Sequence, residues 1–380
     1  MQDDSDEDDI PLEGLGYVEF GDEAEEGEED GLVLSRSGAA APGYCLLAAI
    51  PFATAVLLDS EGDEVHRWSD AGGGTWQRAR LLGNGDLIVV SRPLGSLRFV
   101  LERRSWQNEL LWSAPIDPHH DVRELKDGTL LVLTWELRPF PELGIAMGAG
   151  EVSETLIKDN HVTRLSAEGE VLGRFSVGEP LVAARESLEL LIPDEIDPET
   201  GKGKDLFHCN SLFVMDDPEL VQRDPLYTLG NVLLSSRHQN LLFVIDRANG
   251  ELVWSWKDPS VEWQHEASVL PNGNILLFDN GRSERAWSRL LEVDPLKREI
   301  VWEYRAPNET DFFSQARGTV ERIENGNLLV AHSEKGEIFQ LNEAGEVVWR
   351  YLAPHYNEKN ERGVVRVQYY ERERVERYLR

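Results

Sequence analysis

The sequence predicts an all-β fold, a six-bladed β-propeller in a single domain. Two short strand patterns alternate along the chain, their turns favour tight hairpins, and helical periodicity is almost absent. Four-stranded units of about 40 to 50 residues that repeat several times are typical of propellers, whose sheets pack face to face around a central channel. The length of 380 residues does not require a second domain, because propellers often exceed the usual domain size.

The first pattern joins two apolar strands through a short turn and ends in an aromatic residue. Six copies occur, which read VLLDSEGDEVHRW (56–68), FVLERRSWQNELLW (99–112), VTRLSAEGEVLGRF (162–175), LFVIDRANGELVWSW (242–256), LLEVDPLKREIVWEY (290–304) and FQLNEAGEVVWRY (339–351). The closing aromatic residues are Trp68, Trp112, Phe175, Trp254, Trp302 and Trp349, at spacings of 44, 63, 79, 48 and 47 residues. Six copies predict six blades, and the two long spacings predict insertions.

The second pattern is a hairpin, in most copies with an Asn-Gly or Asp-Gly turn. The copies read LLGNGDLIVV (81–90), LKDGTLLVL (125–133), LGNVLLSS (229–236), LPNGNILLF (270–278) and IENGNLLV (323–330), of which the first three are looser matches. Both dipeptides adopt the positive φ angles that fit the twist of paired strands. The two patterns together supply about four strands per blade, and we expect residues 364–370 to supply the strand that closes the ring.

The propeller domain is expected to span residues 36–380, with insertions near 136–160 and 176–207. The second insertion is rich in Pro, Glu and Asp. Loops of this length in a compact domain are usually functional or disordered. On a propeller we expect these insertions to lie over one face, at a mouth of the channel.

Residues 1–35 are predicted to form a disordered acidic tail. The first 30 residues hold fifteen Asp or Glu and no Lys or Arg, which leaves −17 of the total net charge of −32 for the rest of the chain. Like charges at this density repel one another and stay solvated, and calcium binding is the alternative for this segment. The net charge also argues against a nucleic-acid partner, because such binding depends on Lys and Arg that neutralise phosphates.

The sequence gives weak signals for location. The longest apolar run, residues 44–58, is broken by Pro51 and is shorter than the roughly 20 residues that a membrane span needs. The abrupt acidic start is typical of a secreted or lipid-anchored protein whose targeting segment has been removed. We therefore expect a periplasmic or extracellular protein, with a lipid anchor at the removed N-terminus as an option. Cys45 and Cys209 do not decide the redox compartment.

Histidine recurs at one position of the repeat. Alignment of the modules on the hairpin pattern places at this position Gln77, His120, His265 and Gly318, and in the interrupted third module His208. If these residues begin the innermost strands, three histidines converge at one mouth of the channel. A transition metal is the alternative occupant of such a group. The chain has no HExxH, CxxC or EF-hand pattern, so we expect no metal and no cofactor.

Two expectations concern the other histidines. His119 is expected to point away from His120, since adjacent strand residues face opposite sides. Three histidines have no counterpart in other modules and are expected on the surface: His66, His161 and His355.

A second group of polar residues follows the ends of the hairpins, in SSRHQ (235–239), FDNGRSER (278–285) and LLVAHSEKG (328–336). These segments bring to one end of the ring Arg237, His238, Asn280, Arg282, Arg285 and His332. Guanidinium groups bind sulfate or phosphate oxygens in pairs, and histidine acts as a nucleophile or an acid–base group near neutral pH. A local cationic patch on an acidic chain indicates an anionic substrate.

Several of these strings together resemble the bacterial arylsulfate sulfotransferases and their wider relatives. The resemblance runs in order over roughly residues 40–352, through HCNS (208–211), SSRHQ (235–239), WQHEASVLPNGNILLFDNG (263–281) and IVWEY (300–304). It implies a six-bladed propeller that moves a sulfuryl group from a phenolic sulfate ester to a phenol through a sulfated histidine. The partners implied are therefore a small aryl sulfate and a phenol, without a nucleotide donor.

The resemblance also implies roles for individual residues. By motif, His208 matches the family's histidine in HxNS and His265 the one in QH, and the arginine after FDNG is Arg285 by spacing, with Arg282 as the alternative. The family's nucleophilic histidine lies in a later blade, where the only histidine here is His332, which does not align cleanly. The expected catalytic residues are therefore His208, His265, His332 and Arg285. The expected substrate contacts are Arg282, Arg237, His238, His120 and Asn280.

Two other functions stay open. One is a non-catalytic propeller of the same family that binds a ligand or a partner protein, because propellers host both roles. The other is a hydrolytic or lyase activity on anionic sugars or esters.

Overall fold

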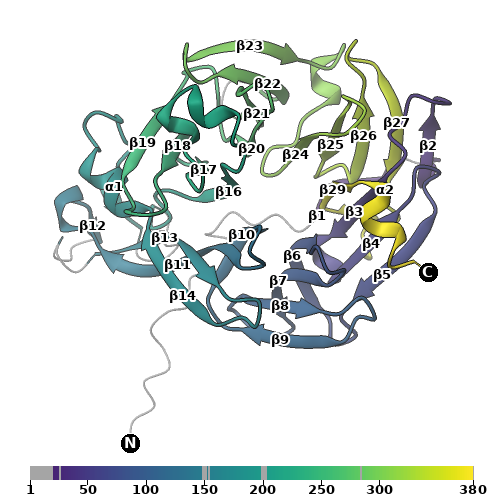
Figure 1. Cartoon of the computed structure of the whole chain (residues 1–380), viewed down its shortest axis with the longest axis horizontal. Helices are drawn as coiled ribbons and strands as arrows, with labels where there is room; N and C mark the ends of the chain where they lie inside the picture. The colour runs from purple at the N-terminus through teal and green to yellow at the C-terminus, as the bar shows by residue number, and fades with distance from the viewer. Residues whose placement is uncertain are drawn as a thin grey trace, which may run out of the picture.

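Six β-sheets surround a common axis in the computed structural model, as the sequence predicts (Figure 1). The structure describes residues 20–24, 27–147, 152, 155–197, 203–282 and 285–379. Each blade is an antiparallel sheet of four strands, and the sixth blade has a fifth strand at its outer edge. In blades 2 to 6 the strand nearest the axis precedes the next three strands of its blade in the chain. The predicted fold class is confirmed.

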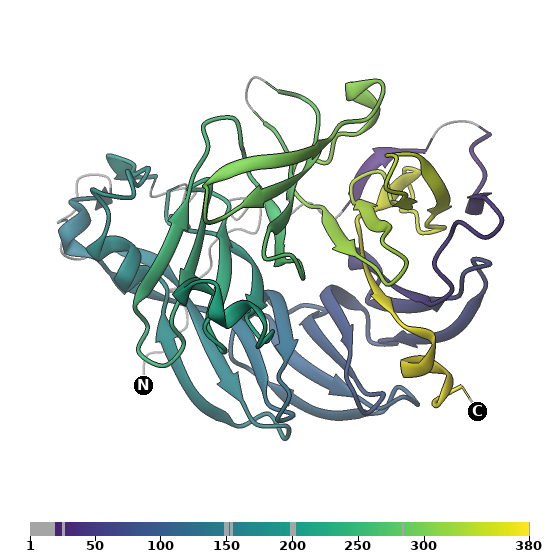
Figure 2. The same cartoon turned by 45° about the horizontal axis from the view of Figure 1, so that its top comes forward.

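The first blade joins the two ends of the chain. Its strands, from the axis outward, are β29 (Val365–Tyr370), β3 (Tyr44–Ala49), β4 (Thr54–Leu58) and β5 (Glu64–Ser69). Strand β29 comes from the C-terminal end and pairs with β3 in the register Tyr369↔Cys45. Figure 2 shows the yellow C-terminal and purple N-terminal parts of the chain side by side. The predicted closing strand at 364–370 is therefore confirmed.

The other blades follow in chain order. Blade 2 contains β6 (Gly74–Leu81), β7 (Leu87–Pro93), β8 (Val100–Arg104) and β9 (Leu110–Ala114), and blade 3 contains β10 (Pro118–Glu124), β11 (Leu130–Pro139), β13 (Leu156–Leu165) and β14 (Val171–Ser176). Blade 4 contains β16 (Cys209–Val214), β17 (Val232–Ser236), β18 (Leu241–Ile245) and β19 (Leu252–Trp256), and blade 5 contains β20 (His265–Val269), β21 (Ile275–Asp279), β22 (Arg289–Asp294) and β23 (Glu299–Tyr304). Blade 6 contains β24 (Thr319–Arg322), β25 (Leu328–His332), β26 (Glu337–Leu341), β27 (Val347–Leu352) and, outermost, β2 (Gly31–Ser35).

Helical structure is short in the described residues. The α-helices are α1 (Gly178–Ala183) and α2 (Arg372–Glu376), and the 3₁₀ turns are η2 (Ile50–Phe52), η3 (Pro141–Leu143), η5 (Leu220–Gln222), η6 (Pro225–Tyr227) and η7 (Glu309–Asp311). None of the helices in the described ranges has the length and apolar character needed to cross a membrane.

The closing aromatic residues of the first pattern link neighbouring blades. The indole N–H of Trp68 in blade 1 donates to the carbonyl of Ser105 in blade 2 at 3.1 Å, and that of Trp112 in blade 2 donates to Ala167 in blade 3 at 3.0 Å. Trp349 in blade 6 donates to Ser60 in blade 1 at 2.9 Å. A buried indole N–H needs such an acceptor. In these three blades the repeated tryptophan therefore fixes the outer strand to a turn of the next blade.

The hairpin pattern gives the expected turns. Gly273 and Gly326, which follow Asn in the two closest copies, have φ angles of +87° and +85°. Residues with side chains rarely adopt this region, which explains the Asn-Gly pairs. The apolar residues that alternate along the strands then fill the space between blades, as in the cluster that includes Leu277, Leu291 and Val244.

The two insertions contact each other at the outer edge of the ring, where Figure 1 places α1 and β12. Strand β12 (Ala146–Met147), from the first insertion, pairs in parallel with β15 (Glu195–Ile196), from the second. Asp159 fixes the start of the second insertion by accepting from the Ser176 hydroxyl at 2.7 Å and from the Gly178 N–H at 2.9 Å. The second insertion then returns toward the axis at Asp205, directly before blade 4.

Part of the segment predicted as a disordered tail forms strands. β1 (Phe20–Glu23) pairs with β28 (Glu361–Gly363), and β2 pairs with β27. Buried Arg362 makes ion pairs with Glu28 and Asp30 at 2.9 and 2.8 Å. The prediction of disorder through residue 35 is therefore wrong for these strands, because pairing and a buried guanidinium compensate the local negative charge. Residues 1–19 lie outside the described residues.

Candidate functional site

The innermost strands bring three histidines to one mouth of the channel. His120 lies on β10, His208 directly precedes β16, and His265 begins β20. The imidazole rings of His120 and His208 are 4.8 Å apart. His265 lies close enough for the charges of Arg237 and His208, together with burial, to lower its pKa. All three side chains are buried. The predicted convergence at one repeat position is thus what the structure contains.

The same strands are irregular at this position. The register shifts between Pro118 and Val122 in β10, and His120 has a φ of +57°. A bulge of this kind breaks the alternation of side chains and re-aims them. His119 therefore does not point away as expected, because its Nδ1 lies 3.0 Å from Nδ1 of His120.

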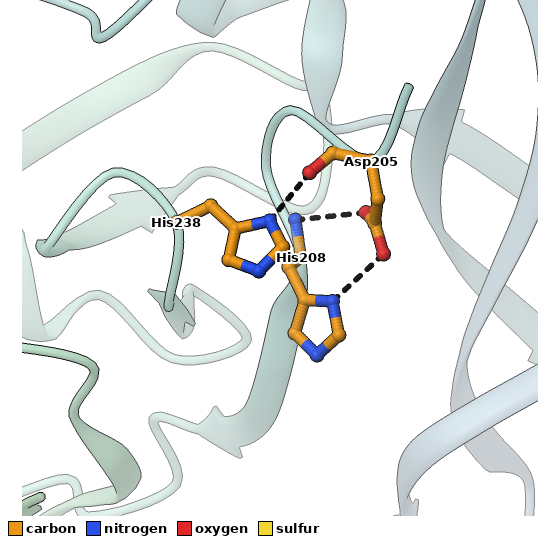
Figure 3. Close-up of side chains that lie close together, drawn as sticks. All are labelled: Asp205, His208 and His238. Atoms are coloured by element: carbon orange, nitrogen blue, oxygen red, sulfur yellow. Dashed lines mark hydrogen bonds and ion pairs between the residues drawn. The ribbon is translucent and has the colours of Figure 1, made fainter. Parts of the chain in front are cut away.

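A carboxylate orients His208. Asp205 lies three residues before it, and its Oδ2 is 2.7 Å from Nδ1 of His208, while Nδ1 of His238 is 2.6 Å from the Asp205 carbonyl oxygen (Figure 3). The rings of His208 and His238 are 4.5 Å apart. Burial lowers the pKa of His208 well below its ordinary value. The imidazole is therefore neutral at neutral pH, with its Nδ1–H donated to the carboxylate.

The same three residues offer atoms within 4.8 Å of one another, a spacing that metal ligands could have. However, the Lys158 ammonium lies 3.2 Å from Asp205 Oδ2, and His238 donates Nδ1–H to a carbonyl. Although burial opposes ionisation, Lys158 and His208 hold the pKa of Asp205 well below its ordinary value. Lysine already supplies the cation beside this carboxylate, so the donor set does not fit a metal ion.

Asn280 orients His265. Nδ1 of His265 is 2.7 Å from Oδ1 of Asn280 and 2.8 Å from the carbonyl oxygen of Trp263, and both are acceptors. The Asn280 side chain is itself fixed, because its Nδ2 donates to the carbonyls of Ser314 and Arg317. Nδ1 of His265 therefore carries the proton, and Nε2 is a buried acceptor with no hydrogen-bond partner among the described residues.

Buried arginines surround these imidazoles. Arg237 and Arg366 are each 3% exposed. Burial and the nearby Arg317 lower the pKa of Arg237 to about 9, and burial and Arg78 lower that of Arg366 to about 9. In the described part of the chain, Nε of Arg237 and both Nε and Nη2 of Arg366 are buried donors without a hydrogen-bond partner. Unsatisfied buried donors are rare and call for an acceptor, such as a ligand oxygen.

Trp263 lies at the rim of this group. The guanidinium carbons of Arg237 and Arg282 are 3.8 and 3.6 Å from the centre of its ring. Its backbone N–H donates to Asn240 Oδ1 at 3.0 Å, and its φ is +60°. One exposed and one buried arginine thus contact the same indole ring.

An ionic layer closes the channel beneath the histidines. Arg78 donates to Glu266 at 3.1 Å, and Arg80 pairs with Asp121 at 2.8 Å. Burial, Arg123 and Arg78 lower the pKa of Arg80 to about 10. A cavity of about 440 Å³ opens on the far side of this layer. The layer therefore separates the histidine mouth from the opposite end of the channel.

The sequence matches a known family over two-thirds of its length. The family model for arylsulfotransferase (ASST) matches residues 105–354, from the end of blade 2 to the end of blade 6. The chain belongs to the arylsulfotransferase family. No curated protein matches it. The family match includes His120, His208, His265 and Arg237, whereas Arg366 lies beyond it.

Solved structures with some similarity to this chain include the following two. A protein of unknown function from Bacteroides caccae has a TM-score of 0.52 at 14% identity, covering 82% of this chain and 94% of that one. A virginiamycin B lyase from Staphylococcus aureus has a TM-score of 0.41 at 9% identity, covering 74% and 71%. At these identities the Bacteroides caccae protein indicates the propeller fold alone.

Two residues expected in the catalytic group have other partners in the structure. His332 lies 2.8 Å from the Phe313 carbonyl through Nε2 and 3.3 Å from Glu337 through Nδ1. His332 ends β25, and Asp279 occupies the same position at the end of β21. Arg285, the second residue, pairs with the Asp279 carboxylate at 2.6 Å, as does Arg289. Since adjacent strand residues face opposite sides, this position points away from the one that Asn280 occupies. The hydrogen bonds of His332 and Arg285 in the described ranges involve Phe313, Glu337 and Asp279 rather than the histidine group.

The other residues that the sequence predicted to contact the substrate do not all lie in the histidine group. Arg237, His238, His120 and Asn280 lie in the histidine group, and Arg282 contacts Trp263 at its rim. His161 is buried within 3.6 Å of Asp159, so its expected surface position is wrong.

Sequence reasoning missed Asp205, Lys158, Trp263, Arg317 and Arg366 as members of the candidate site. The sequence offered signals for two of them: Asp205 is the acidic residue three positions before HCNS, and Trp263 is the aromatic residue two positions before His265. Lys158 and Arg366 come from β13 and from the closing strand, so only the ring brings them to the other residues.

Proposed function

We propose that this arylsulfotransferase-family protein transfers a sulfuryl group from a phenolic sulfate ester to a phenol at the histidine mouth. The observation that carries the proposal is a set of unmatched hydrogen-bonding groups. Donors of Arg237 and Arg366 and the acceptor Nε2 of His265 are buried without partners among the described residues. A bound sulfate ester would supply oxygen acceptors to the arginines and a reacting group to the imidazoles.

Charge supports the same substrate class. Burial and other arginines lower the pKa values of Arg237 and Arg366. An anion beside these two guanidiniums would stabilise their charged form. Guanidinium N–H groups match the oxygens of a sulfuryl group, and they act most strongly where water is excluded. We infer that Arg237 and Arg366 hold the sulfuryl oxygens and stabilise the charge that develops on them during transfer.

The imidazoles suit transfer because they are neutral. Burial and the nearby arginine Arg237 lower the pKa of His265 well below its ordinary value. Because Nδ1 of His265 donates to carbonyl oxygens, Nε2 is free of its proton and can accept the proton of a phenol that attacks sulfur. We infer that His265 is the general base toward the acceptor phenol, with Asn280 as its positioning residue.

The test is sulfuryl transfer from p-nitrophenyl sulfate to added phenol. We expect release of p-nitrophenol with matching formation of phenyl sulfate. Arg237→Gln and Arg366→Gln should each lower kcat/KM by about 10²-fold, the usual cost of one lost charge-stabilising donor. Arg36→Gln is the matched control, since Arg36 is exposed and pairs only with Glu346 among the described residues. No turnover by folded protein with any phenol would contradict the proposal.

A second function is a non-catalytic propeller that binds an anionic ligand at the same mouth. The observation in its favour is that His332 is bonded to Phe313 and Glu337 rather than to the histidine group. Binding of an aryl sulfate, detected by calorimetry and lost in Arg237→Gln, without any turnover would favour this function over transfer.

A further inference from the structure

We propose that His208 is the residue that accepts the sulfuryl group and that Asp205 is its positioning residue. This inference rests on the proposed function and deepens it. It replaces His332, the only histidine of the later blade, whose two ring nitrogens lie near Phe313 and Glu337.

The hydrogen bonds assign the reactive nitrogen of His208. Asp205 is held ionised by Lys158 at 3.2 Å, and an ionised carboxylate only accepts. Nδ1 of His208, 2.7 Å from Asp205 Oδ2, therefore carries the proton. Nε2 keeps its lone pair, and it lies 3.4 Å from Nη1 of Arg237. The lone pair is thus directed to the guanidinium that we assign to the sulfuryl oxygens.

The carboxylate distinguishes His208 from His265. Nδ1 of His265 has two neutral acceptors, the Asn280 amide and the Trp263 carbonyl. When an imidazole is sulfated on Nε2 with Nδ1 still protonated, its ring becomes positive. Asp205 compensates that charge at 2.7 Å, whereas Asn280 compensates only part of it. The structure therefore assigns the covalent step to His208 and the proton transfer to His265.

The reaction then balances in two steps. The Nε2 lone pair of His208 forms the N–S bond while the S–O bond to the donor breaks, and its electron pair leaves on the phenolate oxygen. The product is an N-sulfated imidazolium paired with Asp205. The acceptor phenol then attacks sulfur, the N–S bond breaks with its electron pair returning to Nε2, and the phenol proton goes to Nε2 of His265. Release of that proton to solvent completes the cycle.

The test of the nucleophile is the trapped intermediate. Wild-type protein mixed with 4-methylumbelliferyl sulfate without acceptor and quenched in alkali should gain the mass of one sulfuryl group, located on the peptide with His208. His332→Gln should still form this adduct, and His208→Gln should not. An adduct on His332 or His265, or transfer to phenol without any adduct, overturns the assignment. Absence of turnover by wild-type protein overturns the proposed function itself, so the two failures are distinguishable.

The test of Asp205 separates positioning from structure. Asp205→Asn should lower kcat at least tenfold with little change in KM, because the arginines that hold the sulfuryl group are unchanged. The acid limb of its pH–rate profile should move to lower pH, since removal of the carboxylate makes protonation of His208 harder. Asp216→Asn, on the exposed end of blade 4, is the matched control. An equal fall in kcat with an unmoved acid limb would overturn the positioning role.

Discussion

Arg237 and Trp263 are in direct contact, with the guanidinium carbon 3.8 Å from the centre of the indole ring. Arg282 lies 3.6 Å from the same ring, so one aromatic side chain holds two cations that repel each other. The indole therefore fixes the direction of Arg237, which also lies 3.4 Å from Nε2 of His208. Trp263 is thus the link between the rim of the propeller and its histidine mouth.

Trp263→Ala is expected to raise the KM for an aryl sulfate by about tenfold, which corresponds to the loss of one partly buried cation–π contact. Trp263→Phe should have a smaller effect. Trp287→Ala is a matched control, because Trp287 also carries two arginines, Arg285 and Arg305, each 4.7 Å from its ring centre. Steady-state kinetics measure the effect, and an equal change in both alanine variants would contradict it.

The folding stability should fall as pH drops below 6.5. Burial lowers the pKa of His265 well below 6.5 and that of His119 to about 3. In the unfolded chain these imidazoles take up protons as pH falls through 6.5, whereas in the folded protein they stay neutral. The unfolded state then binds more protons, so each such histidine costs up to about 1.4 kcal/mol per pH unit below 6.5 and nothing above it. Urea unfolding at a series of pH values measures this, and a flat profile through 6.5 would contradict it.

Gly318→Ala should destabilise the protein by about 1 to 3 kcal/mol, in the range for overpacking a core. A Cβ at residue 318 would lie 2.7 Å from the ring of Phe278, and its φ of +156° is one that residues with side chains rarely adopt. Gly326→Ala separates the two causes, because that glycine also has a positive φ but only a carboxylate oxygen 3.4 Å away. Thermal unfolding measures both variants, and equal effects would exclude the contact with Phe278 as the cause.

Arg362→Ala should release the N-terminal strand β1 and lower stability by about 2 kcal/mol. Arg362 is 1% exposed and pairs with Glu28 and Asp30, but these carboxylates are partly exposed, so the loss is smaller than for a fully buried pair. Limited proteolysis should cut the variant near residue 24 faster than wild-type protein. Arg36→Ala is the control, since Arg36 makes an exposed ion pair with Glu346. Unchanged proteolysis of Arg362→Ala would argue against this anchoring role.

The repeat pattern was enough to predict the blades. Trp68, Trp112 and Trp349 recur because each must donate its indole N–H to the next blade, and Asn-Gly recurs because the hairpins need positive φ. The pattern failed for strand β2, since pairing with β27 depends on a partner more than 300 residues away. Local charge alone therefore overstated the extent of the tail.

The site was predictable only in part. His120, His208 and His265 share a repeat position, so strand geometry brings them together at one mouth whatever the loops do. His332 and Arg285 instead bond to Phe313, Glu337 and Asp279, because the side-chain direction at a strand end depends on alternation and on bulges, such as the one in β20, that sequence spacing does not show.

Patterns within a few neighbouring residues were enough to predict the strands of the repeats, their number per blade and the repeat position of the histidines, because strand alternation and turn residues act over short stretches of chain. The closing strand was predicted too, although its partner β3 lies more than 300 residues away. Which charges meet at the axis depends on closure of the ring. Arg366 comes from the last strand, Lys158 from β13 and Arg237 from the end of β17, and the ring places all of them near His208 or His265. Electrostatic interactions depend on distance in space, which ring closure sets and which separation along the chain does not.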